Sequence, residues 1–248
     1  MKKILLSLLG LAVSAAAAAS GGALPYQFKE DTGNLASAQR GARNFMNYCS
    51  GCHSMKHLRY ARIGQDLQIP DDLLKANLMF TSDKPGDAIK SSINPEEAAK
   101  WFGQAPPDLS VETRLRGADW VYNFLLTFYL DEKKATGVNN LMLPGASMPH
   151  VLGDLQGWQV KHEAPKPEAG AAAHGGGHDK PQFELTVPGK LSPEDYKKFV
   201  ADTVNFMAYA AEPGKAQRIS AGISSILFLI VFTALAYALK KEYWKDVH

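Results

Sequence analysis

A run of twenty-one residues without a charged side chain, from Ile219 to Leu239, constrains this chain more than any other feature. As an α-helix rising about 1.5 Å per residue, the run covers about 30 Å, the thickness of the hydrocarbon core of a bilayer. Lysines follow it, with Tyr243 and Trp244 at positions suited to the membrane interface. The sequence therefore predicts one transmembrane helix over 219–239, a short tail over 240–248 and a lipid bilayer around the helix.

Residues 1–19 have the three parts of a secretory signal peptide. Lys2 and Lys3 precede an apolar stretch from Ile4 to Val13, and small residues suited to a signal peptidase follow. An uncleaved anchor is the alternative, but the apolar stretch is shorter than the ~20 residues that a spanning helix needs. We therefore expect a domain over 20–214 on the periplasmic side of a bacterial inner membrane, with the tail in the cytoplasm.

The composition is that of a folded chain, with 46% hydrophobic and 21% charged residues. The chain has 27 basic and 25 acidic side chains, and loss of Lys2 and Lys3 with the signal peptide leaves 25 of each. A neutral mature chain has no general electrostatic reason to bind nucleic acid, so we expect no nucleic-acid partner.

Helical periodicity predicts a mainly α fold for the exported region. Residues 36–48 form one expected helix, with Ser37 as the candidate N-cap, and residues 118–130 form another. A third is expected to begin after Ser192 as N-cap, with Pro193 in its first turn, and to end by Pro213. No alternating pattern of strands is visible.

Residues 161–181 lack large apolar side chains and are rich in Pro, Gly and Ala, which predicts a flexible surface loop. His174 and His178 lie in this stretch. Ordering such a segment around a metal ion costs conformational entropy, so solvated histidines are the favoured interpretation.

The five residues Cys49-Ser50-Gly51-Cys52-His53 form C-x-x-C-H, the attachment sequence of c-type haem. The two thiols add across the two vinyl groups of one haem, and His53 is then held against the iron as an axial ligand. A thiol-disulfide oxidoreductase and a structural disulfide are the rival interpretations. In that oxidoreductase the pair opens a helix, which lowers the thiol pKa. Here a helical pattern precedes the pair, which favours haem attachment.

The residues alone leave the second axial ligand open. Met79, Met142 and Met148 are candidates, and His150 is the runner-up. Met148 precedes Pro149, which disfavours helix and favours an extended loop that could project the thioether. Methionine is also a common filler of protein cores, so a packing role for Met148 is equally consistent with the sequence.

Several stretches resemble the cytochrome c1 family, the haem subunits of the ubiquinol:cytochrome c oxidoreductase complex. Gly41, Phe45 and Cys49 at intervals of four are similar to the first helix of class I cytochromes c, with the helix after Ser192 as its crossing partner. Four further stretches resemble the family in chain order: 106–110 (PPDLS), 114–120 (RLRGADW), 144–149 (PGASMP) and 210–213 (AAEP). Residues 164–180 depart from the family's pattern.

The resemblance implies a class I cytochrome c-like haem domain with loop insertions and one C-terminal transmembrane helix. It also implies the residues of the haem site. These are Cys49 and Cys52 as covalent attachment points for one haem c, His53 and Met148 as axial ligands of the iron, Arg116 with Arg114 as its alternative at a haem propionate, and Pro107 on the His53 side of the haem. A guanidinium group suits a partly buried carboxylate such as a propionate.

The resemblance further implies an electron carrier that is not itself an enzyme. Cytochrome b and a Rieske iron-sulfur protein are the implied partners in the complex, the latter as electron donor, and a cytochrome c is the implied acceptor. The alternative is a membrane-anchored cytochrome c of a terminal oxidase. That class is not expected to carry the stretches 106–110 and 114–120.

Overall fold

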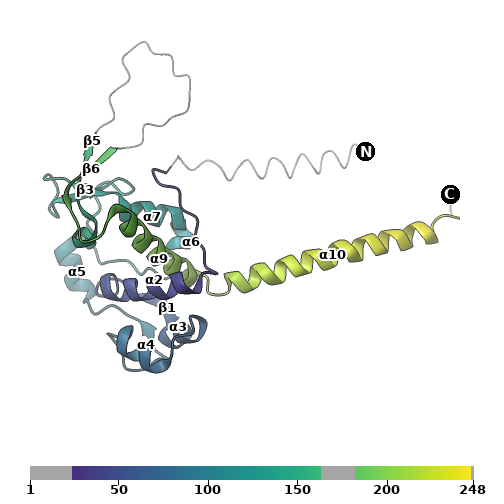
Figure 1. Ribbon diagram of the computed structural model, residues 1–248. Coiled ribbons are helices and arrows are strands. Elements are labelled where there is room, and N and C mark those ends of the chain that lie inside the picture. Colours follow the sequence, from purple (N-terminus) through teal and green to yellow (C-terminus); the bar gives the residue numbers. More distant parts are fainter. Residues whose placement is uncertain (1–23, 163–181, 247–248) are drawn as a thin grey trace, which may run out of the picture. The chain divides into compact units, whose positions relative to one another are not determined.

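The computed structural model describes residues 24–162 and 182–246 (Figure 1). The predicted signal peptide and most of the predicted loop over 161–181, including His174 and His178, lie outside the described residues. The described chain forms two compact units. The first unit contains residues 24–29 and 119–198, and the second contains residues 30–118 and 199–246.

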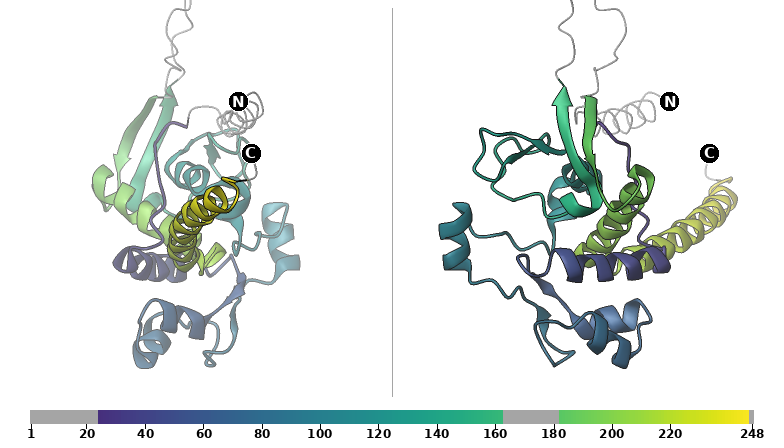
Figure 2. Two further views of the ribbon diagram at one scale, coloured as in Figure 1. Left: turned by 90° about the vertical axis from the view of Figure 1, so that its right-hand side faces the viewer. Right: turned by 60° about the vertical axis from the view of Figure 1, so that its left-hand side comes forward.

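The second unit is built mainly from helices, with one short two-stranded ladder (Figure 2). Its elements are α2 (Leu35–Tyr48), β1 (Met55–Arg59), α3 (Tyr60–Asp66), α4 (Asp71–Asn77), β2 (Ala88–Ile89), α5 (Pro95–Phe102), α6 (Glu112–Arg116), most of α9 (Pro193–Ala211) and α10 (Lys215–Tyr243). β1 and β2 are antiparallel, with Met55 opposite Ile89.

The helix α2 crosses α9 at Gly41. A Cβ atom at this position would lie 2.0 Å from the carbonyl oxygen of Asp202 and 2.7 Å from the Cβ of Phe206, so only glycine permits the crossing. One turn further along, Phe45 is fully buried, and its ring centroid lies 5.7 Å from that of Phe206. The predicted crossing of these two helices at a glycine is therefore confirmed.

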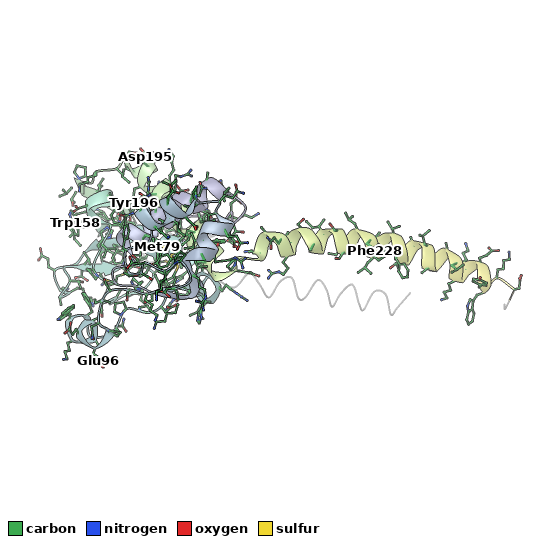
Figure 3. All side chains as sticks on the ribbon, turned by 90° about the horizontal axis from the view of Figure 1, so that it is seen from below. Met79, Glu96, Trp158, Asp195, Tyr196 and Phe228 are labelled. Atoms are coloured by element: carbon green, nitrogen blue, oxygen red, sulfur yellow. The ribbon has the colours of Figure 1, made fainter. Side chains whose placement is uncertain are left out.

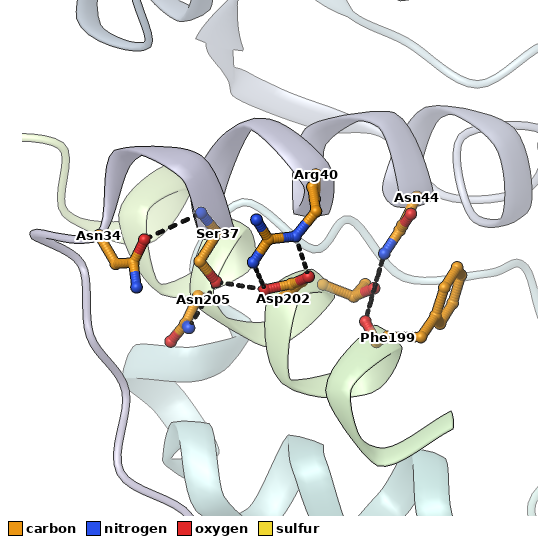
Figure 4. Close-up of polar contacts among 8 residues, drawn as sticks. Asn34, Ser37, Arg40, Asn44, Phe199, Asp202 and Asn205 are labelled. Atoms are coloured by element: carbon orange, nitrogen blue, oxygen red, sulfur yellow. Dashed lines mark hydrogen bonds and ion pairs between the residues drawn. The ribbon is translucent and has the colours of Figure 1, made fainter. Parts of the chain in front are cut away.

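Polar contacts bind the two helices together around the crossing (Figure 4). Arg40 donates two hydrogen bonds to Asp202, from Nε to Oδ2 at 2.6 Å and from Nη2 to Oδ1 at 2.9 Å. Asn44 donates from Nδ2 to the carbonyl oxygen of Phe199 and to Oγ1 of Thr203, each at 3.2 Å. The glycine contact is thus flanked on both sides by bonds that fix the rotation of α2 about its own axis.

The N-cap of α2 is Asn34, so the prediction of Ser37 as N-cap is wrong. The side chain of Asn34 accepts a hydrogen bond of 3.1 Å from the backbone N–H of Ser37, as expected of a capping asparagine. The hydroxyl group of Ser37 is buried and donates to Oδ1 of Asp202 at 2.6 Å. Ser37 therefore stabilises the crossing of α2 and α9 through this hydrogen bond. The predicted cap at Ser192 is confirmed, because its Oγ accepts from the backbone N–H of Asp195 at 3.1 Å.

The first unit contains two antiparallel ladders beside its helices (Figure 2). Its elements are α7 (Ala118–Leu126, whose first residue belongs to the second unit), β3 (Phe128–Leu130), β4 (Val138–Asn140), α8 (Gly153–Gln156), β5 (Gly157–His162), β6 (Gln182–Pro188) and the first residues of α9. β3 pairs with β4, with Phe128 opposite Asn140, and β5 pairs with β6, with Trp158 opposite Val187.

These ladders correct two boundaries of the sequence analysis. The helix predicted over 118–130 ends at Leu126, because residues 128–130 pair with β4. Lys161 and His162 belong to β5 and pair with residues of β6, so these two residues are not part of a loop, contrary to the prediction over 161–181. The prediction of a mainly α fold is confirmed, since the helices hold far more of the described residues than the short strands do.

The C-terminal helix α10 is long and apolar enough to cross a membrane, with a mean hydropathy of 2.3 over its most apolar window. Its side chains are exposed all along its length, as Figure 3 shows around Phe228. It exceeds the predicted span 219–239 by one turn at each end, and Gly214 is its N-cap. In its first turn, Nζ of Lys215 lies 2.6 Å from Oε1 of Glu30. The predicted transmembrane helix is confirmed as a helix.

We expect Gly41→Ala to destabilise the protein. The added methyl group meets the backbone of Asp202, which cannot move away as a side chain could, and overpacking of this kind costs about 1–3 kcal/mol. The melting temperature of the detergent-solubilised chain, followed by circular dichroism, should fall by about 5 °C or more. Gly86→Ala is the matched control, because a Cβ atom there meets nothing within 4 Å. Equal melting temperatures for the two variants would contradict this account of the crossing.

Candidate haem-binding site

The C-x-x-C-H motif closes the helix α2. Cys49 is the C-cap residue, and its N–H donates to the carbonyl oxygen of Phe45 at 2.8 Å. The carbonyl oxygen of Cys49 then accepts from the N–H groups of Cys52 at 3.1 Å and His53 at 2.8 Å. This compact turn brings two thiols and an imidazole together on five consecutive residues. Both cysteines are unpaired and half-buried.

The chemistry of Cys49 does not suit a thiol-disulfide oxidoreductase. Burial, with a smaller contribution from Cys52, raises the pKa of the Cys49 thiol to about 12, so the free thiol stays protonated at neutral pH. An oxidoreductase needs a lowered thiol pKa, which a helix N-terminus helps to provide. Here the pair lies at a helix C-terminus. Both observations favour cysteines that are used up in a covalent attachment.

The imidazole of His53 is oriented by a backbone carbonyl. Nδ1 of His53 lies 2.8 Å from the carbonyl oxygen of Pro107. A carbonyl can only accept, so the proton sits on Nδ1 and the lone pair is left on Nε2. Burial lowers the pKa of His53, against the opposing effects of this hydrogen bond and of the charges on Glu112 and Asp108. A neutral imidazole whose second nitrogen is hydrogen-bonded is the usual form of a metal-binding histidine.

These residues fit a covalently attached haem. Within the described part of the chain there is no cluster of three His, Cys, Asp or Glu side chains that could hold a bare metal ion. An iron that already has four porphyrin nitrogens needs only one or two ligands from the protein. One oriented histidine next to two unpaired thiols meets that need, and the thiols suit the vinyl groups.

Hydrogen bonds connect the segment after Pro107 to the residues that follow His53. Oδ2 of Asp108 accepts from the backbone N–H of Lys56 at 2.9 Å, and Oδ1 accepts from the backbone N–H of Ser110 at 2.9 Å. The N–H of Leu109 donates to the carbonyl oxygen of Ser54 at 2.9 Å. The motif PPDLS therefore works as a clip that places the carbonyl of Pro107 against the imidazole. The sequence analysis named Pro107 but missed Asp108 and Ser110, although both lie in the quoted stretch.

The predicted arginines lie on or beside the short helix α6. Nε of Arg116 lies 2.6 Å from Oε1 of Glu112, one turn earlier, and Arg114 is exposed. In the same helix, Thr113 is buried and donates from Oγ1 to the carbonyl oxygen of Met207 on α9 at 3.2 Å. Glu112 is thus the carboxylate partner of Arg116 in this structure. Contact of either arginine with a haem propionate remains a prediction.

The candidate sixth ligands lie in different parts of the chain. Met79 is buried in the second unit, in the segment after α4 (Figure 3). Met142, Met148 and His150 belong to the first unit, in the non-helical segment between β4 and α8. Met142 and Met148 are both half-buried. The absence of helix around Met148 agrees with the effect expected of Pro149. Its pairing with His53 remains a prediction.

The segment before Met148 is fixed by a tight turn and two asparagines. The N–H of Ala146 donates to the carbonyl oxygen of Leu143 at 3.0 Å, and Gly145 has a φ of +82°, which together define a type II turn with proline and glycine at its centre. Oδ1 of Asn139 accepts from the N–H of Gly145 at 2.8 Å, and Oδ1 of Asn140 accepts from the N–H of Met142 at 2.8 Å. The turn is therefore bonded to β4.

His150 lies among aromatic rings of the first unit. Its ring stacks on Phe128 at 4.9 Å between centroids with an interplanar angle of 12°, and it meets Trp158 edge-on at 5.8 Å and 87°. Burial lowers the pKa of His150 to about 4, in spite of a raising contribution from Gln156, so the imidazole is neutral near pH 7. Its Nε2 atom is buried and has no hydrogen-bond partner. The imidazole of His150 is thus packed against Phe128 and Trp158.

The C-x-x-C-H turn lies at the end of a helix that crosses a later helix at a glycine. The described chain also has one helix long enough to span a membrane. Together these features define a membrane-anchored c-type cytochrome. The comparisons with known proteins narrow this class. The profile of the Cytochrome C1 family matches residues 26–163 and 191–247. The chain belongs to the cytochrome c1 family, and it is accordingly a haem electron-transfer protein.

Similar proteins include two that are named cytochrome c1 and one that carries a different name. A cytochrome c1 from Allochromatium vinosum is 46% identical over 247 residues, which cover 100% of this chain and 99% of the relative. An ammonia monooxygenase gamma subunit from Nitrosomonas europaea is 42% identical over 218 residues, with coverage of 88% and 86%. A cytochrome c1 from Rhodospirillum rubrum is 28% identical over 240 residues, with coverage of 84% and 81%.

The family match also delimits the part of the chain that departs from the family. Residues 164–190 fall between the two matched ranges, and they contain the stretch 164–180 that the sequence analysis set apart. The strand β6 lies within this unmatched segment, whereas its partner β5 lies within the matched one. The ladder of β5 and β6 therefore joins a strand inside the matched range to a strand outside it.

We expect Asp108→Ala to weaken the clip and to lower the free energy of unfolding by about 1–2 kcal/mol at pH 7, through the loss of hydrogen bonds to a carboxylate. Burial would raise the pKa of Asp108, but hydrogen bonds from Ser110 and Lys56 outweigh it and hold the pKa below its ordinary value of 3.8. Its contribution is therefore full above about pH 4 and is lost as the pH falls through the lower folded-state pKa.

Denaturant unfolding of the parent and variant at several pH values measures this effect. The difference in unfolding free energy should shrink between pH 5 and pH 2, and exposed Asp83→Ala serves as the control. A difference that stays constant over this range would show that the carboxylate does not act through its charge.

Proposed function

We propose that Cys49 and Cys52 attach one haem c covalently and that His53 is an axial ligand of its iron. The observation that carries this proposal is the bond from Nδ1 of His53 to the carbonyl of Pro107, since it directs the lone pair on Nε2 outward for a metal. Two unpaired thiols in the same turn support it. Bound haem supplies a one-electron couple, and the residues around it set the potential through ligation, burial and charge.

We further propose Met148 as the second axial ligand. Its place in a non-helical loop before Pro149, between a bonded turn and a packed histidine, supports this role. The family resemblance of the stretch 144–149 supports it as well. A thioether donates weakly to ferric iron, so this ligand favours the ferrous state and a high potential. Arg116, or Arg114 in its place, is proposed to pair with a haem propionate, and Pro107 to contact the haem beside His53.

The proposed role is that of the cytochrome c1 subunit of a ubiquinol:cytochrome c oxidoreductase. The chain takes electrons from a Rieske iron-sulfur protein and passes them to a cytochrome c, and cytochrome b is a neighbour in the same membrane. The helix α10 anchors the chain in a bacterial inner membrane, with the haem domain on the periplasmic side. Two relatives named cytochrome c1 support this role, one matched over nearly its whole length and the other over 81% of its length.

Loss of either proposed attachment thiol tests the cofactor assignment. In Cys49→Ala and Cys52→Ala, one bond between the chain and a vinyl carbon cannot form, so covalently bound haem should fall several-fold or disappear. Haem staining after denaturing electrophoresis measures it, and Ser50→Ala between the two thiols is the control. Undiminished stain in both cysteine variants would overturn the assignment.

Purification of the tagged chain from detergent-solubilised membranes tests the proposed complex. A cytochrome b, recognised by a b-type haem spectrum, and a Rieske protein, recognised by its iron-sulfur signal in electron paramagnetic resonance, should purify with it. A version that stops before Ile219 is the control and should lose the cytochrome b. Recovery of copper or haem-copper subunits instead would point to a terminal oxidase.

A further inference from the structure

We propose that His150 is a positioning residue for Met148. In this view Phe128 and Trp158 form an aromatic seat for its ring, and the seat holds the loop so that the thioether stays on the haem iron. The proposal rests on Met148 being the axial ligand, as proposed above. It assigns His150 a packing role toward the iron in place of the ligand role considered from the sequence.

The loop itself gives Met148 little support. Among the described residues, no hydrogen bond involves the backbone of Ser147 or Met148. The nearest backbone bonds are those of Ala146 to Leu143 on one side and of Val151 to Pro149 on the other, at 3.0 Å and 2.9 Å. The position of Met148 is therefore set by whatever holds the two ends of this short segment.

Both ends of the segment rest on the same pair of strands. Before Met148, Asn139 and Asn140 of β4 accept bonds from the turn at Gly145 and from Met142. After Met148, the ring of His150 stacks on Phe128 of β3, and Phe128 is directly opposite Asn140 in the ladder. One ladder thus anchors the loop from both sides.

The seat of His150 is built from a buried ring and paired strands. Phe128 is 1% exposed, and Trp158 is held in β5 opposite Val187. Gly153 closes the remaining side, since a Cβ atom there would lie 3.0 Å from the ring of Trp158 and 3.3 Å from Cδ2 of His150. The N–H of Gly153 also donates to the carbonyl oxygen of His150 at 3.1 Å. Only Pro149, whose φ is fixed by its ring, separates this seat from Met148.

This arrangement explains how a weak ligand can stay bound. An iron–thioether bond is readily exchanged for another ligand, so its occupancy depends on how far the free loop already holds the bound geometry. A stacked histidine two residues away, connected through a proline, restricts the loop in that way. Loss of the stack should increase the fraction of ferric protein in which Met148 is detached, by about two- to tenfold for one aromatic pair.

Imidazole binding to the ferric haem of the full-length, detergent-purified protein measures this fraction, because added imidazole binds only where Met148 has left the iron. In His150→Ala the apparent affinity for imidazole should rise two- to tenfold. In His150→Phe, which keeps a planar ring and removes both nitrogens, the affinity and the red-edge absorption band of iron–sulfur ligation should stay at parental values. A role in folding stability alone would leave imidazole affinity unchanged in both variants.

Trp158→Leu repeats the test from the other side of the seat, with exposed Trp101→Leu as the matched control, and it decides the outcome if His150→Ala does not accumulate with haem. Parental imidazole affinity in His150→Ala, or in Trp158→Leu when the first is missing, overturns the proposal. An equal rise in His150→Phe and His150→Ala also overturns it, because the ring nitrogens and not the stack would then be responsible.

Met148→Leu separates this proposal from the one on which it rests. If Met148 is the ligand, this variant loses the red-edge band and binds imidazole more tightly than His150→Ala. If it keeps the parental band and affinity, the assignment of Met148 is wrong and the positioning role falls with it. If it loses the band while His150→Ala behaves as the parent, only the positioning role is overturned.

Discussion

The contact of Gly41 on α2 with the backbone of α9 at Asp202 is the constraint on which the second unit depends. Because Gly41 has no side chain, α2 and α9 approach so closely that a Cβ atom at this position would overlap the carbonyl oxygen of Asp202. The bonds of Arg40 and Asn44 to α9 then fix how α2 is rotated. Because Cys49 is the C-cap of the same helix, this contact also fixes where the motif begins.

The C-x-x-C-H turn is held by two sets of hydrogen bonds that act on different atoms. The helix end supplies the turn through the carbonyl oxygen of Cys49, which gathers the N–H groups of Cys52 and His53. The clip around Asp108 supplies a carbonyl for Nδ1 of His53, from a segment more than fifty residues later in the chain. The first set places the thiols, and the second chooses the histidine tautomer. The second is the kind of hydrogen bond that orients a metal-binding imidazole.

The first unit relies on strand pairing where the second relies on a helix crossing. The short ladder of β3 and β4 bonds the turn before Met148 through asparagine side chains and supports the ring of His150 through Phe128. The loop around Met148 has few backbone hydrogen bonds of its own, so its conformation depends on contacts with these neighbours. This division fits the proposed haem site, in which His53 follows the two proposed attachment cysteines at the end of a helix, whereas Met148 lies in a loop that its neighbours must hold.

The sequence by itself determined the features that depend on neighbouring residues. The C-x-x-C-H spacing, the membrane-length run 219–239 and the cap at Ser192 are all local, because covalent geometry and helical periodicity act over a few positions. Gly41 and its crossing helix were also accessible, through their similarity to class I cytochromes c.

The tertiary structure decided what depends on partners far away in the chain. Ser37 looked like an N-cap, but its hydroxyl is drawn to Asp202, which leaves the cap to Asn34. The helix over 118–130 stops at Leu126 because β4 offers the next residues a ladder. His150 was the second candidate for the axial ligand after the methionines, and its stacking on Phe128 and edge contact with Trp158, both distant in the chain, were visible only in the folded structure. A hydrogen bond or ring contact across many residues leaves no periodic trace in the sequence, so only the folded chain reveals it.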